Sequence, residues 1–151
     1  MGVDAVTPAQ RELALWLLEE ETGDDRGPEA LVDAADVACQ KLGRRLTRLI
    51  TVVGYQALLA RALHLARSEF SVLDGVRAAA TDGTCLEGMR AKVGGSELAM
   101  LQAALTSVLA NMIGLLITFI GDNLALRLVR EIWPDAPYTG TSLWPAEEPQ
   151  P

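Results

Sequence analysis

The chain has 151 residues, half of them apolar and only 5% aromatic, and it carries 24 leucines and 22 alanines. This length and composition correspond to one domain with a sizeable core of helix-forming residues, and they argue against an all-β sandwich or barrel. Two distant cysteines, Cys39 and Cys85, and a single histidine argue against a disulfide scaffold and a multi-histidine metal centre, so we expect no metal or other cofactor.

The net charge of −7 is distributed unevenly along the chain. Residues 1–38 carry a balance of −8, residues 39–67 carry six basic residues and no acid, and residues 68–151 carry a balance of −5. A chain this acidic overall is a poor nucleic-acid binder, so we expect no nucleic-acid partner. Arginine outnumbers lysine eleven to two, a bias common in GC-rich bacteria, which favours a bacterial source.

The first helix is predicted to begin at residue 8. Thr7 can act as the N-cap, Pro8 suits the first helical position, and Gln10 stands where a capping box needs Glu or Gln. Residues 22–27 are rich in glycine and acidic residues, which predicts that the helix ends there.

A second helical region begins at Pro28. Apolar residues follow at intervals of three and four residues: Leu31, Ala35, Ala38, Leu42, Leu46, Leu49 and Val53. Gly43 and Gly54 interrupt this pattern, and each costs about 1 kcal/mol relative to alanine in a helix interior. The pattern predicts either one long helix to about Ser68 or a bend near one of the glycines.

Residues 71–96 are the least regular part of the chain and contain several turn signals. We expect a short helix over residues 85–92, with a short hairpin about Asp82 and Gly83 as the alternative. Ser96 then caps a long final helix that is expected to run to about Ile132, before Trp133.

Residues 98–121 contain no charged side chain and are long enough to cross a bilayer core. Polar side chains such as Gln102 and Asn111 interrupt the segment, so we favour a central, buried helix over a membrane span. The sequence therefore predicts an all-α bundle of about four helices over residues 1–134, with a long, strongly apolar C-terminal helix. Five of the seven prolines lie in the last eighteen residues, which predicts a flexible Pro-rich tail over residues 135–151.

Lys41, Arg44, Arg45 and Arg48 are spaced by three and four residues and share one helix face. We expect this basic stripe to be a solvated face that pairs with the acids of residues 12–36. The functional alternative is a patch for phosphate, anionic lipid or an acidic partner. His64 is a weak candidate phosphoacceptor, because a phosphotransfer domain would need an exposed histidine flanked by cations such as Arg61 and Arg67. We favour an ordinary surface histidine.

The apolar helix carries one narrow neutral strip of Ser107, Asn111 and Thr118. About three other helices can hardly cover the rest of it, so we expect a homodimer with this strip at the self-association face. Nucleophile elbow, Walker loop and dinucleotide-binding motifs are absent from the sequence.

The sequence therefore favours a non-enzymatic helical adaptor or scaffold that acts through self-association and protein contacts at the stripe or the tail. The first alternative is a membrane-associated protein that uses residues 98–121, and the second is a histidine phosphotransfer module. The first residues lack a basic segment followed by an apolar run, so we expect no signal peptide and a cytoplasmic location.

Overall fold

The computed structural model describes residues 7–24, 27–81, 84–89, 91, 94 and 97–136. Within these residues the chain forms five α-helices, which confirms the predicted all-α class: α1 (Pro8–Thr22), α2 (Pro28–Leu46), α3 (Val52–Arg67), α4 (Leu98–Ile120) and α5 (Asp122–Ile132). A 3-10 turn, η1 (Ser71–Leu73), and two strands, β1 (Arg77–Thr81) and β2 (Thr84–Glu87), lie between α3 and α4.

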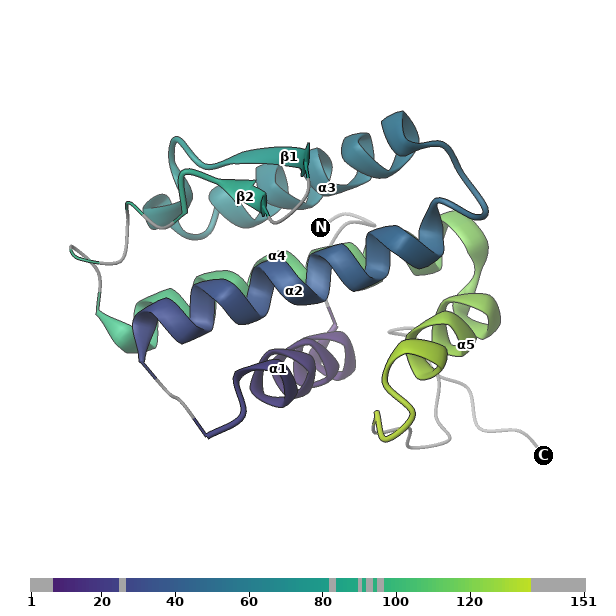
Figure 1. Ribbon diagram of the computed structural model, residues 1–151, viewed down its shortest axis with the longest axis horizontal. Helices are drawn as coiled ribbons and strands as arrows, with labels where there is room; N and C mark the ends of the chain where they lie inside the picture. Colours follow the sequence, from purple (N-terminus) through teal and green to yellow (C-terminus); the bar gives the residue numbers. More distant parts are fainter. Residues whose placement is uncertain are drawn as a thin grey trace.

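Helix α4 is the centre of the bundle, and α1, α2, α3 and α5 all pack against it (Figure 1). Its side chains are buried from Ala104 to Ile113 without interruption. Of the described helices, α4 alone is long and apolar enough to cross a bilayer, and 67% of its most apolar window is buried within the chain. The other helices therefore cover most of the surface of this bilayer-length apolar helix.

The start of α1 follows the predicted capping pattern. The Thr7 hydroxyl accepts a hydrogen bond from the Gln10 backbone N–H at 3.1 Å, and the Gln10 side-chain carbonyl accepts one from the Thr7 N–H at 3.2 Å. Pro8 occupies the first turn, and Gly23 follows the last residue with a positive φ of 67°. The predicted first helix is confirmed at both ends.

The second helical region is broken between the two glycines rather than continuous. Helix α2 ends at Leu46, and α3 begins at Val52 after the N-cap Thr51, whose hydroxyl accepts a hydrogen bond from the Gly54 N–H at 3.0 Å. Of the two predicted alternatives, the bend near one of the glycines is confirmed and the continuous helix is wrong. Gly43 stays inside α2, where the Tyr55 ring packs against its backbone.

The predicted single final helix is wrong, because the chain turns sharply at Gly121. This residue has a φ of 89°, a backbone conformation that glycine adopts at little cost, and it separates α4 from α5. The turn lets Leu128, Val129 and Trp133 be buried against the bundle. A straight continuation of α4 would carry these side chains into solvent. Ser96, the expected cap, lies outside the described residues.

The segment after η1 is an antiparallel hairpin, so the expected helix over residues 85–92 is wrong and the alternative is confirmed. Arg77 pairs with Glu87 and Ala78 with Leu86, and the register shifts before the pair of Thr81 and Thr84. Asp82 and Gly83 lie outside the described residues. Asp36 of α2 holds β2 in place, because its carboxylate accepts a hydrogen bond from the Leu86 N–H at 2.9 Å.

Packing continues slightly past the predicted domain boundary at residue 134. Trp133 and Ala136 are buried, and the Ala136 N–H donates a hydrogen bond to the Trp133 carbonyl at 2.9 Å. The remainder of the predicted tail, residues 137–151, lies outside the described residues.

Candidate functional site

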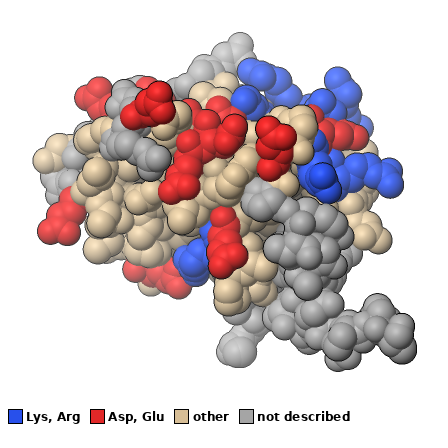
Figure 2. All heavy atoms as spheres, turned by 90° about the horizontal axis from the view of Figure 1, so that it is seen from below, with Lys and Arg blue, Asp and Glu red and all other residues tan. Residues whose placement is uncertain are grey.

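Charged side chains are separated on the surface of the bundle. Figure 2 shows basic side chains gathered mostly at one end of the molecule and acidic side chains spread over much of the rest of that face. In Figure 1 the corresponding end is the one where the α2–α3 turn and the α4–α5 turn meet. The basic stripe predicted from the sequence runs toward this end along the second half of α2.

Lys41 is the member of the stripe that contacts two other parts of the chain. Its ammonium lies 2.6 Å from a carboxylate oxygen of Glu21, a side chain only 12% exposed. The Trp133 indole N–H donates to the same oxygen at 2.8 Å, and the Lys41 ammonium lies 5.9 Å from the centroid of the Trp133 ring. Lys41 thus links α2 to α1 and to the segment after α5, and it pairs with an acid of the expected range.

The other three members of the stripe differ from Lys41. Arg45 forms an ion pair with Glu131 of α5 at 2.7 Å, which lies outside the acidic range that the sequence suggested. Arg44 and Arg48 are exposed and form no ion pair with any residue that the structure describes. The structure therefore divides the stripe into two paired cations and two that face solvent without an acidic partner.

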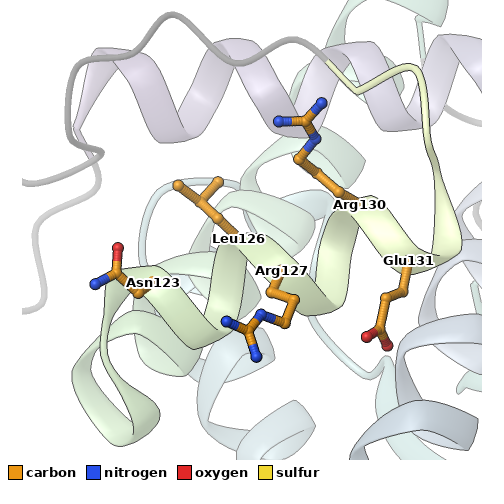
Figure 3. Close-up of a pocket in the computed structure, with 5 residues that line it drawn as sticks. All are labelled: Asn123, Leu126, Arg127, Arg130 and Glu131. Atoms are coloured by element: carbon orange, nitrogen blue, oxygen red, sulfur yellow. The ribbon is translucent and has the colours of Figure 1, made fainter.

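Helix α5 adds Arg127 and Arg130 to the same end of the molecule. Arg127, Arg45 and Arg48 line a hollow of about 200 Å³ between α2 and α5. Arg127 and Glu131 also line an adjoining hollow of about 410 Å³, whose described lining belongs to α5 (Figure 3). In Figure 3, Arg130 extends on the opposite side of α5 from Arg127 and Glu131. We call the five arginines together the basic end: Arg44, Arg45, Arg48, Arg127 and Arg130.

Arg127 and Arg130 were not among the predicted site residues, because a single straight final helix would carry them away from the basic stripe. The available signal was the pair of cations that follows the uncharged residues 98–121. The turn at Gly121 places α5 beside α2, which brings Arg127 to the hollow lined by Arg45 and Arg48.

Exposed apolar side chains gather at the same end. Of the eight large apolar side chains exposed in the described part of the chain, five flank the α2–α3 and α4–α5 turns. Val53 is 76% exposed, and Leu49 and Leu124 both line the hollow that contains Arg45, Arg48 and Arg127. We call these five residues the apolar tip: Leu49, Val52, Val53, Phe119 and Leu124.

His64 lies exposed on α3, as an ordinary surface histidine would, and its surroundings differ from the phosphate cradle that a phosphotransfer module would need. The Arg67 guanidinium donates to the backbone carbonyl of Val76 at 2.7 Å and to that of Leu73 at 3.4 Å. Arg67 is thus engaged in holding the η1 loop against the end of α3, which leaves it poorly placed to hold a phosphate on His64.

The predicted self-association strip does not form one exposed face. Ser107 and Asn111 are buried inside the chain, and only Thr118 is exposed. The Asn111 side-chain amide donates to the Ser107 carbonyl at 2.8 Å, and the Ser107 hydroxyl donates to Glu69, just after α3, at 3.3 Å. Helices of the same chain therefore cover two of the three strip residues, which does not favour a two-fold interface at this strip.

A further groove of about 490 Å³ lies between the first halves of α1 and α4. Leu15, Ala99, Gln102 and Ala103 line it, as does Thr106. The Thr106 hydroxyl is buried and has no hydrogen-bond partner among the residues that the structure describes.

Comparisons with protein-family models, with curated protein sequences and with solved structures find no match to this chain. Among the described residues, no three His, Cys, Asp or Glu side chains are grouped so that they could hold a metal ion. The basic end and the apolar tip are therefore the features from which a function can be inferred.

Proposed function

We propose that this protein is a non-enzymatic association module that binds an anionic surface through its basic end. The observation that carries the proposal is the gathering of arginines from two helices at one end of a chain whose net charge is −7. Arg44, Arg48 and Arg127 form no ion pair with a described residue, so their guanidinium groups remain available to carboxylates or phosphates outside the chain.

The neighbouring apolar tip supports a role of the basic end in binding a partner. Interfaces combine arginine with large apolar side chains, because burial of the apolar groups strengthens the charge-assisted hydrogen bonds around them. Leu49 and Leu124 share one hollow with Arg48 and Arg127, so a partner would meet both kinds of side chain together. An adaptor or scaffold in the cytoplasm is the cellular role that we propose for such a surface.

The test compares two triple variants with the same change in net charge. Arg44→Gln, Arg48→Gln and Arg127→Gln remove unpaired cations of the basic end, whereas Arg11→Gln, Arg61→Gln and Arg77→Gln remove cations elsewhere. The probes are a fluorescent polyglutamate peptide and vesicles that contain phosphatidylglycerol. We expect the first variant to bind at least one probe about tenfold or more weakly than the wild type, since each arginine near an anionic surface contributes about 1 kcal/mol.

The control variant should bind within about twofold of the wild type, because its arginines lie away from the proposed contact. Equal weakening of both variants would show that net charge rather than the basic end is recognised. A wild-type protein that binds neither probe at low salt would overturn the proposal.

A further inference from the structure

We infer that the anionic surface is a lipid bilayer, on which the protein docks peripherally with the apolar tip in the interfacial region and the basic end on the headgroups. This inference rests on the proposed function and names its partner. It differs from a membrane span, because most of α4 stays buried in the bundle and only its C-terminal end, through Phe119, belongs to the apolar tip.

The two surfaces are interleaved at one end of the molecule. Leu49 lies in the α2–α3 turn, Val52 and Val53 begin α3, and Phe119 and Leu124 flank the α4–α5 turn. Figure 1 shows both turns at the same end of the long axis. Side chains from two adjacent turns at the end of a bundle can enter a planar interface together, with the helices remaining above it.

The side chains of the apolar tip are more exposed than is usual for large apolar residues on a surface that binds no partner. Val53 is 76% exposed, Phe119 58%, and Leu49 and Val52 53% each. Such a concentration of exposed apolar groups at one place marks an interaction surface. Peripheral proteins bury apolar side chains of this kind about 5–10 Å into the boundary between headgroups and acyl chains.

The charge around the apolar tip suits an anionic headgroup layer. The whole α2–α3 turn and α3 contain no acidic residue. Of the two acids in the sequence of α5, Glu131 is paired with Arg45, and Asp122 is the first residue of the helix. The basic end therefore presents an excess of cations beside the apolar groups, which is the combination that binds anionic lipids.

A bilayer fits this surface better than a helical protein segment does. An amphipathic helix needs an elongated apolar groove for its apolar face. At the basic end, charged side chains make up more than half of the described lining of both hollows. Of the apolar tip, Leu49 and Leu124 line the smaller hollow, and the other three residues lie at the helix ends that flank the two turns, where a flat, deformable partner can reach them.

Vesicle co-sedimentation tests the inference with the full chain. Vesicles of phosphatidylcholine alone are compared with vesicles that contain about 30% phosphatidylglycerol, at low and high salt. We expect binding to the anionic vesicles only, with a loss of binding at high salt because the Debye length shortens.

Two double variants separate insertion from charge attraction. Leu49→Ser with Val53→Ser alters the apolar tip, and Leu98→Ser with Met100→Ser alters exposed apolar side chains on α4 away from it. We expect the tip variant to bind anionic vesicles about tenfold or more weakly and to bind the polyglutamate peptide unchanged. The α4 control should bind both probes as the wild type does. Thermal unfolding checks that both variants remain folded.

Each result has a distinct meaning. Binding of the peptide without binding of vesicles would leave the proposed function intact and overturn the bilayer as partner. Equal binding to neutral and anionic vesicles, or undiminished vesicle binding by the tip variant, would also overturn this inference. Failure of the wild type with both probes would overturn the proposed function itself.

Discussion

The phenolic hydroxyl of Tyr55 donates a hydrogen bond to the backbone carbonyl of Cys39 at 2.6 Å, across the contact between α3 and α2. The ring reaches this carbonyl because Gly43 lies one helical turn further along α2 and has no side chain. A Cβ atom at Gly43 would lie 2.9 Å from Cε2 of Tyr55. The glycine inside α2 is therefore explained by the close approach of an aromatic ring from the next helix.

Gly43→Ala should destabilise the protein even though alanine is the better helix former. The clash with the Tyr55 ring is expected to lower the free energy of unfolding by about 1–3 kcal/mol, in the range of overpacked cores. Urea-induced unfolding measures the change. Gly94→Ala is the control, since open space surrounds Gly94. A Gly43→Ala protein as stable as the wild type would contradict the close packing of Tyr55.

The basic stripe should separate into two pairs with different effects on stability. Lys41→Gln with Arg45→Gln removes two ion pairs and is expected to lower the free energy of unfolding by about 1 kcal/mol or less per pair, with a smaller effect at high salt. Arg44→Gln with Arg48→Gln should leave stability unchanged and weaken binding instead. Thermal unfolding at two salt concentrations distinguishes the pairs. Equal losses from both variants would contradict this division.

Thr106→Val should stabilise the protein. Within the described part of the chain the buried Thr106 hydroxyl has no hydrogen-bond partner, and an unsatisfied buried polar group costs about 1–3 kcal/mol. Valine has nearly the same shape without the hydroxyl, so the free energy of unfolding should rise. Thr118→Val is the control at an exposed position of the same helix, with an expected change within about 0.5 kcal/mol. A loss of stability in Thr106→Val would show that the hydroxyl is hydrogen-bonded in solution.

Residues 137–151 should be dispensable for folding, because a segment with this proline-rich, polar composition buries little apolar surface. A chain that ends at Ala136 is expected to keep the wild-type thermal midpoint. A chain that ends at Ile132 also loses the buried Trp133 and its hydrogen bond to Glu21, so its midpoint should fall clearly. Equal midpoints for the two truncated chains would contradict this role of Trp133.

We still expect a homodimer, but for a different reason than the apolar character of α4. Helix α4 is covered by four helices of its own chain, whereas exposed acids such as Glu12, Glu19 and Glu20 complement the basic end of a second copy, so self-association and membrane binding compete for the same arginines. In a two-fold pair each acidic surface can meet the partner's basic one. Light scattering should report a dimer at low salt that dissociates as salt is added. A monomer at every salt concentration would contradict the prediction.

Local sequence was sufficient wherever the interacting groups lie within one or two helical turns. The start of α1 depends on Thr7, Pro8 and Gln10 alone, and these residues form the predicted capping box. The burial of α4 follows from a long run without charge, because such a helix must be covered by other apolar surface. The all-α class and the central position of this helix were therefore determined by the sequence itself.

Tertiary contacts decided the remaining features, since their energy comes from groups far apart in the chain. A glycine inside a helix costs only about 1 kcal/mol, which is too little by itself to end the final helix at Gly121. The helix ends there because the turn allows Leu128 and Trp133 to be buried against the bundle. The hairpin depends on a hydrogen bond that the Leu86 N–H donates to the Asp36 carboxylate, and these two residues lie fifty positions apart in the chain. The basic end exists because the same turn at Gly121 brings Arg127 beside Arg48, and spacing along the chain carries no information about that proximity.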